Sequence, residues 1–196
     1  MGRIIGQMYI TMLPVILAGI LNMVCVKQKW FKKYAKPLDR NAVLKDGKRI
    51  FGDNKTDFGI ITMIICSVIT HIIWGYICSV WSTGRELNQL YKVYENNICF
   101  NFALGWIMGV AYMIFELPNS FIKRRLEIPD GKTLNGVKGK IFMVVDQVDS
   151  LFGVIAVLAF VSPITIGEYF NYIILGGLTH ITANWIMYKM KIRRNL

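Results

Sequence analysis

The stretch from Phe58 to Thr83 reads FGIITMIICSVITHIIWGYICSVWST, and its 26 residues contain no charge. A helix rises about 1.5 Å per residue, so about 20 apolar residues are enough to cross a hydrocarbon core of about 30 Å. Four further uncharged runs lie before and after this stretch, at residues 4–26, 98–115, 150–167 and 169–188. We therefore predict an all-α integral membrane protein, a single membrane domain with about five transmembrane helices, at residues 4–26, 58–82, 98–117, 144–166 and 169–188.

The composition of the chain agrees with a membrane location. Of its 196 residues, 54% are hydrophobic and only 18% are charged, whereas soluble domains average about 25% charged residues. The same numbers exclude an intrinsically disordered chain, which would have too little apolar surface to fold. Transmembrane β-strands would appear as alternating segments of about ten residues, but this sequence has long continuous apolar runs.

Most of the positive charge falls on one side of the predicted helices. Residues 27–57 contain ten lysines and arginines and residues 116–140 contain six; four more follow the last predicted helix. The other side has only Arg3, Arg85 and Lys92. Loops that retain lysine and arginine are cytoplasmic. We therefore predict a multi-pass protein of the cell membrane with its N-terminus outside and its C-terminus cytoplasmic, and we attribute the net charge of +11 to topology rather than to nucleic-acid binding.

The cytoplasmic loops predicted at residues 27–57 and 118–143 are long, and long loops are where function is expected. In the first loop, Gly47, Gly52 and Gly59 punctuate a basic stretch that ends where a helix begins. Backbone N–H groups freed by glycine, together with a lysine, a hydroxyl and a helix N-terminus, form an anion site. The stretch is not a Walker A loop, which has the pattern GxxxxGK[ST]. Taken alone, it fits a phosphate cradle and a basic loop held against anionic lipid equally well.

The helix that follows the second loop begins with a pair of carboxylates. Asp146 and Asp149 are spaced i, i+3, which places both on one helical face. Two desolvated carboxylates repel each other, and a Mg²⁺ ion completed by substrate phosphates removes that conflict. The competing interpretation is that Lys123, Arg124 or Lys140 neutralises them. With the basic first loop, the pair favours phosphoryl or nucleotidyl transfer.

Four residues inside the predicted helices have a structural interpretation. Gly105 and Gly109 form a GxxxG pair, which is typical of a close contact between helices. His71 and His180 each lie in the middle of a predicted span. A neutral imidazole hydrogen-bonded between helices is the favoured interpretation of both, although a polar residue inside a membrane is also a functional candidate.

The two loops carry motifs that resemble a known family. Residues 37–59 read PLDRNAVLKDGKRIFGDNKTDFG, which is similar to the first-loop motif of CDP-archaeol synthases. Residues 120–124 (SFIKR) and 146–149 (DQVD) resemble their second-loop motifs and, in the same order, the C-terminal signature of CDP-diacylglycerol synthases. The five predicted spans agree with the architecture of the archaeal family. The resemblance implies transfer of CMP from CTP to a membrane lipid phosphate, with Mg²⁺ as cofactor and release of pyrophosphate.

This reaction assigns roles to the polar residues of both loops. Asp146 and Asp149 are the predicted metal ligands, and Asp130 is a third candidate, although Pro129 replaces the lysine of the family's Lys-Asp pair. The predicted catalytic residues are Lys55, Lys123, Arg124, Asp146 and Asp149. The predicted nucleotide- and phosphate-binding residues are Asp39, Asp46, Gly52, Asp53, Asn54, Lys55, Thr56, Asn119, Ser120, Lys123 and Arg124, with Asp39 and Asp46 orienting the first loop.

Two departures from the family motif concern the first loop. Asn41 stands where the archaeal motif favours glycine. Asparagine tolerates the left-handed backbone conformation, so we expect the turn to be preserved. Asp57-Phe58 replaces an expected Trp-Arg before Gly59, which removes one cation from the predicted triphosphate site.

The absence of histidine and cysteine from both loops agrees with the implied chemistry. A lipid phosphate monoester has a second pKa near about 6, so it is already a dianionic nucleophile at neutral pH and requires no general base. Its requirement is charge neutralisation by cations. A CDP-alcohol phosphotransferase would require DxxDGxxAR, which this chain lacks. A transporter or lipid-binding scaffold would explain the apolar runs but would leave the paired aspartates without a purpose.

Overall fold

The computed structural model describes residues 2–129 and 136–190, and these residues are predominantly helical. The long helices are α1 (Gly2–Cys25), α3 (Asp57–Val80), α5 (Ile98–Arg125), α6 (Gly136–Val161) and α7 (Ile166–Lys189). Short helices α2 (Lys29–Tyr34), α4 (Ser82–Leu87) and η1 (Leu90–Lys92) lie in the connections. Extended pairing in the described ranges is limited to two isolated bridges, Pro37 with Thr56 and Val43 with Arg49. The prediction of an all-α protein is confirmed.

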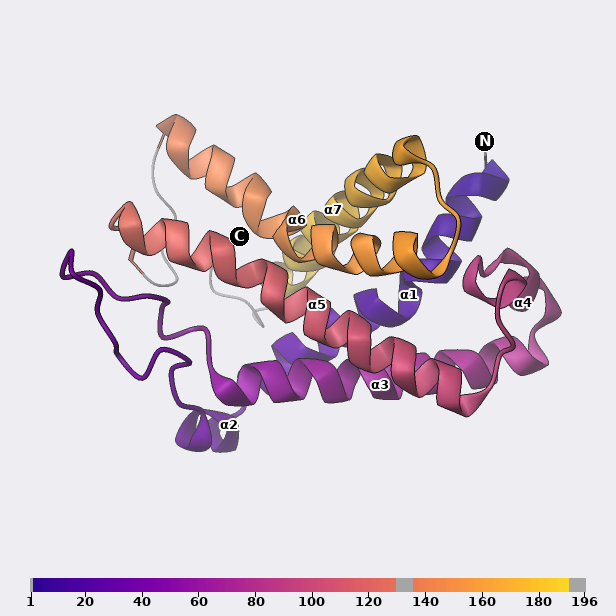
Figure 1. The fold of residues 1–196 in the computed structure, drawn as a ribbon, viewed down its shortest axis with the longest axis horizontal. Coiled ribbons are helices and arrows are strands. Elements are labelled where there is room, and N and C mark those ends of the chain that lie inside the picture. Colours follow the sequence, from indigo (N-terminus) through magenta and orange to yellow (C-terminus); the bar gives the residue numbers. More distant parts are fainter. Residues whose placement is uncertain (1, 130–135, 191–196) are drawn as a thin grey trace.

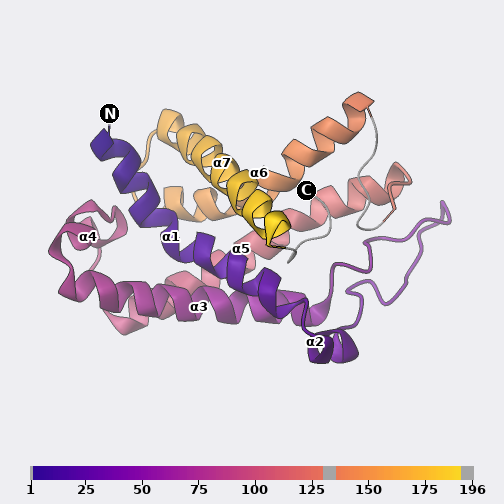
Figure 2. The same ribbon diagram turned by 180° about the vertical axis from the view of Figure 1, so that it is seen from behind.

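The long helices run alternately in opposite directions, and this places both motif loops at the same end of the molecule. At the left of Figure 1 lie α2, the loop before α3, the end of α5 and the start of α6. The opposite end carries the start of α1, helix α4 and the turn between α6 and α7. The view from behind in Figure 2 shows the same division, with α1 and α7 on the near face. The two loops can therefore contribute to one site.

Four helices, α1, α3, α5 and α6, are long and apolar enough to cross a membrane. Helix α7 has 24 residues and the same length as α1 and α3, but it is more polar because it carries Glu168, Asn171, His180 and Asn184. The prediction of about five spans therefore corresponds to four strongly apolar helices and one more polar helix of similar length. Of the polar residues of α7, Asn184 is buried and Asn171 is exposed.

The helices on both sides of the second loop extend past the predicted spans. Residues 118–125 belong to α5 and residues 136–143 belong to α6, so much of the predicted cytoplasmic loop 118–143 is helical. Apolar composition ends near Phe115, but a helix continues for as long as its backbone hydrogen bonds and side-chain packing support it. Pro118 is accommodated inside α5. As a result, Asn119, Ser120, Lys123 and Arg124 lie on a helix.

The core of the bundle is formed by apolar residues from four long helices, α1, α5, α6 and α7, and by one residue of η1. The buried cluster consists of Met8, Met12, Val15, Ile16, Leu90, Leu104, Met108, Leu151, Val154, Ile155, Leu158, Tyr172 and Ile173. A polar contact between α1 and α3 adds to this packing. Pro14 has no backbone N–H, so it cannot donate to the carbonyl of Ile10 four residues earlier; the indole Nε1 of Trp74 donates to that carbonyl at 3.0 Å.

The GxxxG pair lies at the contact between α5 and α3, as the sequence predicted. A Cβ atom on Gly105 would lie 2.7 Å from the Cα atom of Val68, and one on Gly109 would lie 2.8 Å from the Cα atom of Ile64. Backbone atoms cannot move aside as the end of a side chain can. Both glycines are therefore required for the close approach of the two helices.

This contact predicts that Gly105→Ala separates α3 from α5. We expect a loss of about 1–3 kcal/mol, the usual cost of overpacking, measured as a lower temperature of thermal unfolding in detergent. The matched control is Gly6→Ala in α1, where an added Cβ atom has no heavy atom within 4 Å. Equal unfolding temperatures for the two variants would contradict the assignment.

Candidate functional site

The first loop is organised around the carboxylate of Asp39. This side chain is fully buried. It accepts hydrogen bonds from Arg49 Nη2 at 2.7 Å, Arg49 Nε at 3.2 Å, and the backbone N–H groups of Phe51 at 2.9 Å and Asn41 at 3.1 Å. Burial alone raises the pKa of Asp39, but the hydrogen bonds from Arg49 and the backbone outweigh it and lower that pKa overall. Asp39 therefore orients the loop, as predicted, and its oxygens are engaged inside it.

Neighbouring residues show how the rest of the loop is held. Asn41 has a φ of 64°, which confirms the prediction that asparagine preserves the left-handed turn. Arg49 also pairs with Asp53. Asp46 lies on the outer turn of the loop and accepts two hydrogen bonds from Arg125 at the end of α5, at 3.0 and 2.8 Å. The hydroxyl of Thr56 caps α3 by accepting from the N–H of Gly59 at 3.0 Å.

Lys55, at the end of the first loop, reaches into the bundle and pairs with Glu116 of α5. Both side chains are only 20% exposed. Burial lowers the pKa of Lys55, but the charge of Glu116, with smaller contributions from Asp149 and Asp146, raises it overall. The ammonium group is therefore held in its charged form. The sequence analysis did not select Glu116, although its i, i+3, i+7 spacing to Asn119 and Lys123 places all three on one helical face.

The two aspartates of α6 meet this face of α5. The side-chain amide of Asn119 donates to Asp146 Oδ1 and to Asp149 Oδ2, each at 2.7 Å. Lys123 Nζ lies 2.5 Å from Asp146 Oδ1 and 2.6 Å from Asp146 Oδ2. The prediction that the aspartates share a face is confirmed. The competing interpretation, neutralisation by Lys123, is also correct for Asp146.

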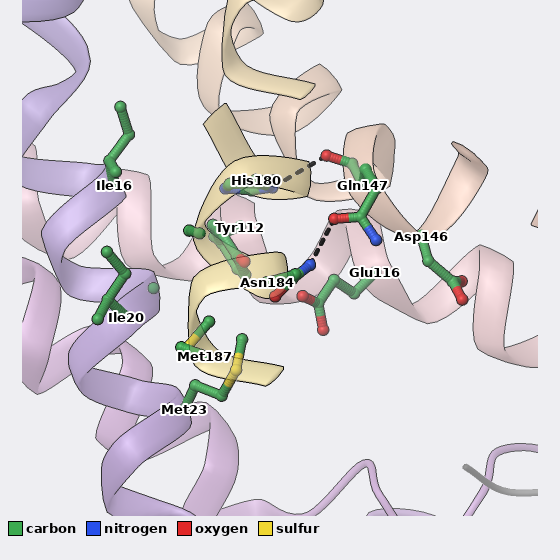
Figure 3. Close-up of a pocket in the computed structure, with 12 residues that line it drawn as sticks. Ile16, Ile20, Met23, Tyr112, Glu116, Asp146, Gln147, His180, Asn184 and Met187 are labelled. Atoms are coloured by element: carbon green, nitrogen blue, oxygen red, sulfur yellow. Dashed lines mark hydrogen bonds between the residues drawn. The ribbon is translucent and has the colours of Figure 1, made fainter. Parts of the chain in front are cut away.

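Glu116 lines two cavities. The first, of about 340 Å³, is lined by predicted nucleotide-binding residues of the loop, namely Asp53, Asn54, Lys55 and Thr56, and by Phe31 of α2. The second, of about 160 Å³, lies between α1, α5, α6 and α7. Figure 3 shows Ile16, Ile20 and Met23 of α1 on one side of it and Glu116, Gln147 and Asp146 on the other. The second cavity is therefore apolar on one wall and polar on the opposite wall.

Polar residues of α7 line the second cavity. His180 Nδ1 donates to the backbone carbonyl of Gln147 at 2.9 Å, and Asn184 Nδ2 donates to Gln147 Oε1 at 2.5 Å. The predicted histidine bond between helices is confirmed for His180. It was wrong for His71, whose Nδ1 donates to Ser67 of its own helix at 2.7 Å. These bonds explain why α7 keeps polar residues inside an apolar bundle.

The remaining predicted residues that the structure describes lie on the first loop or on α5. Gly52 and Ser120 are buried, and Arg124 is half-buried on the last turn of α5. Asp130 lies outside the described residues.

The donors of α6 fit the predicted Mg²⁺ ion. Asp149 accepts from the N–H of Ser150 at Oδ1 and from Asn119 at Oδ2, and each oxygen has a second lone pair available for a cation. Within residues 2–129 and 136–190, no group of three or more carboxylate, histidine or cysteine side chains is arranged to hold a metal. Mg²⁺ commonly uses one or two carboxylates and completes its shell with phosphate oxygens and water. The site therefore suits an ion that binds together with a phosphate substrate.

The model of the family described as CarS-like CDP-archaeol synthase matches residues 2–195. This chain belongs to the CDP-archaeol synthase family. The CDP-archaeol synthase of Methanosarcina mazei is 30% identical over 169 residues, which cover 81% of this chain and 89% of the relative. That of Pyrococcus furiosus is 26% identical over 155 residues, covering 79% and 80%.

A solved structure described as an intramembrane enzyme for archaeal membrane lipids biosynthesis has the same fold as this member of the CDP-archaeol synthase family. The TM-score is 0.62 at 23% identity, and the match covers 90% of this chain and 91% of that one. The arrangement of the helices is therefore shared with that structure.

The pair between Lys55 and Glu116 predicts a coupled effect on stability. Glu116→Gln leaves a mostly buried ammonium group without its carboxylate, and we expect a loss of about 3 kcal/mol because breaking one half of a buried pair is costly. The double variant Lys55→Met/Glu116→Gln removes both charges and should lose less than the sum of the losses of Lys55→Met and Glu116→Gln alone. Thermal unfolding in detergent measures all four proteins. Strictly additive losses would show that the two side chains do not interact.

Proposed function

We propose that this protein is a CTP-dependent cytidylyltransferase that converts an archaeal-type ether lipid phosphate to a CDP-lipid. An oxygen of the lipid phosphate forms a bond to the α-phosphorus of CTP, the bond from that phosphorus to the β-phosphate oxygen breaks, and pyrophosphate leaves. The observation that carries the proposal is the convergence of Lys55, Lys123, Asp146 and Asp149 in a member of the CDP-archaeol synthase family, with Lys55 lining the first cavity and Asp146 the second.

The two cavities support a division of the substrates. The first cavity has the loop residues and Lys55 as its polar wall, and these groups suit the nucleotide and its phosphates. The second has an apolar wall from α1 and a polar wall that includes Glu116 and Asp146, which suits a molecule with a charged head and an apolar chain. Glu116 lines both cavities, so the two phosphate groups would meet near Lys55.

The main task of the protein residues is to neutralise charge. The lipid phosphate needs no general base because its second pKa is near about 6. Lys55, Lys123 and Arg124 are proposed to bind the phosphates, and Asn119 holds Asp146 and Asp149 in place through its side-chain amide. Asp146 and Asp149 are proposed to hold Mg²⁺, which when bound would withdraw charge from the phosphate oxygens. Lys123 balances the charge of Asp146 in the protein alone.

The aspartates supply the test of this function. Purified protein is given labelled CTP, Mg²⁺ and either an isoprenoid-ether or an acyl-ester glycerol phosphate, and release of pyrophosphate and formation of CDP-lipid are measured. We expect both products in equal amounts and faster turnover of the ether lipid. Asp146→Asn and Asp149→Asn should each reduce turnover by a factor of about 100 or more, as does loss of a group that stabilises charge in a transition state.

The matched control is Glu95→Gln, which removes an exposed carboxylate from the connection between η1 and the start of α5 and should leave turnover unchanged. A protein that binds lipid phosphate but releases no pyrophosphate would be a transporter or lipid-binding scaffold. Near-normal turnover of both aspartate variants would assign the pair to structure alone.

The motif loops are proposed to face the cytoplasm, where CTP is found, with the N-terminus outside. This orientation is supported by the excess of lysine and arginine at that end. In a Cys99→Ser background, we expect cysteine introduced at the exposed residue Glu95 to react with a membrane-impermeant maleimide in intact cells. Cysteine at exposed Lys45 should react only after lysis. The reverse pattern would place the site on the wrong side of the membrane.

A further inference from the structure

The turn at Leu44–Lys48 in the first loop is docked against the C-terminal end of α5. The turn is closed by backbone hydrogen bonds from Gly47 to Leu44 and from Leu44 to Lys48, both at 2.9 Å, with Gly47 at a φ of 74°. Charged groups of the turn and of the helix end face each other. We call Asp46, Lys48, Arg125 and Glu127 the loop–helix contact.

Lys48 caps the end of α5. The helix finishes with N–H bonds from Ile128 to the carbonyl of Lys123 and from Glu127 to the carbonyl of Arg124, with Glu127 in the left-handed region at a φ of 58°. This arrangement leaves the carbonyl of Arg125 without a partner inside the helix. Lys48 Nζ donates to that carbonyl at 2.9 Å and pairs with Glu127 at 2.8 Å. A cation here also balances the negative end of the helix dipole.

Arg125 of α5 in turn donates hydrogen bonds to the loop. Its Nη1 donates to both carboxylate oxygens of Asp46, at 3.0 and 2.8 Å, and its Nη2 donates to the backbone carbonyl of Arg49. The guanidinium lies 4.9 Å from the centre of the Phe121 ring, and its side chain is only 22% exposed. Lys48 of the loop therefore donates to a backbone carbonyl of α5, and Arg125 of α5 donates to a backbone carbonyl of the loop. These reciprocal hydrogen bonds fix the position of the loop relative to the helix.

The loop–helix contact is connected to the candidate site through the first loop and through α5. Arg49 takes part in both interactions. Its backbone carbonyl accepts a hydrogen bond from Arg125, and its side chain donates to the buried carboxylate of Asp39. Further along, Lys55 reaches Glu116 of the same helix α5. The loop is thus attached to α5 at two points, Arg125 and Glu116, and Asn119 and Lys123 lie between these points in the helix.

From this geometry we infer that Arg125 is a positioning residue for the CTP site. Through Asp46 and the carbonyl of Arg49 it fixes the first loop relative to α5, so that Lys55 and Lys123 are held at one spacing to receive a triphosphate. The inference rests on the proposed function for the identity of the ligand. The loop–helix contact itself does not depend on that identity, because it is formed by protein groups alone.

The test combines two measurements on Arg125→Gln, Asp46→Asn and the double variant of the full-length protein. Without substrate, hydrogen–deuterium exchange of the amides of residues 42–50 should be about tenfold faster in each variant, since a hydrogen bond to a charged group is lost. With substrates, the KM for CTP should rise about tenfold while kcat changes by no more than about twofold, because the chemical groups are intact. The double variant should resemble the worse single variant, since both lose the same interaction.

Lys45→Gln is the matched control, because Lys45 is an exposed residue of the same turn; its exchange rates and KM should equal those of the wild type. Faster exchange with an unchanged KM would overturn the positioning role and leave a helix cap only. Unchanged exchange in Arg125→Gln would overturn the contact itself. If the wild-type protein forms no CDP-lipid, the proposed function fails, and the exchange measurement still decides whether the contact holds the loop.

Discussion

Charges at the boundary of an apolar bundle need partners, and the site of this protein is built around that requirement. Lys55 pairs with Glu116 and Lys123 pairs with Asp146, and all four residues lie where helices that are otherwise apolar come together. The amide of Asn119 joins the two aspartates of α6 to α5. The result is a cluster in which positive and negative groups balance each other within the protein.

The helices serve this cluster by fixing the distance between α3, α5 and α6. Gly105 and Gly109 allow α5 to approach the backbone of α3, and Lys55 precedes α3 by two residues. The approach therefore determines how far Lys55 reaches toward Glu116. The position of the first loop is fixed in two ways. The buried carboxylate of Asp39 binds Arg49 within the loop, and the loop–helix contact joins the loop to the end of α5. A soluble enzyme can surround a nucleotide with a large domain, whereas the nucleotide site proposed here uses a loop of little more than 20 residues between α2 and α3.

Much of the fold could be predicted from the residues. The apolar runs predict the long helices, the basic loops predict which ends of the helices lie together, and the GxxxG pair predicts a close contact between two helices. The spacing of Asp146 and Asp149 and the left-handed turn at Asn41 were also local properties. The ends of α5 and α6 could not be predicted, because helix continuation beyond Phe115 depends on packing that composition does not reveal. Glu116 was missed for the same reason. A single glutamate at the end of an apolar run has no motif of its own, and its pairing with Lys55 joins residues 61 positions apart.

The partner of Arg125 could not be predicted either, since three consecutive basic residues at 123–125 have the same charge and different environments. Lys123 faces Asp146, whereas Arg125 faces Asp46. Consecutive side chains on a helix point about 100° apart, so neighbouring residues of equal charge contact different parts of the protein. Only the arrangement of loop and helix reveals which basic residue pairs with the aspartates of α6 and which pairs with the first loop.

The most direct measurement of the central claim is a structure determined with CTP, Mg²⁺ and the full-length protein. The account predicts that the triphosphate lies in the first cavity with its oxygens within hydrogen-bonding distance of both Lys55 and Lys123, and that the metal contacts Asp146 or Asp149. A triphosphate that contacts only one of the two lysines, or that binds outside the space between the first loop and α5, would contradict it.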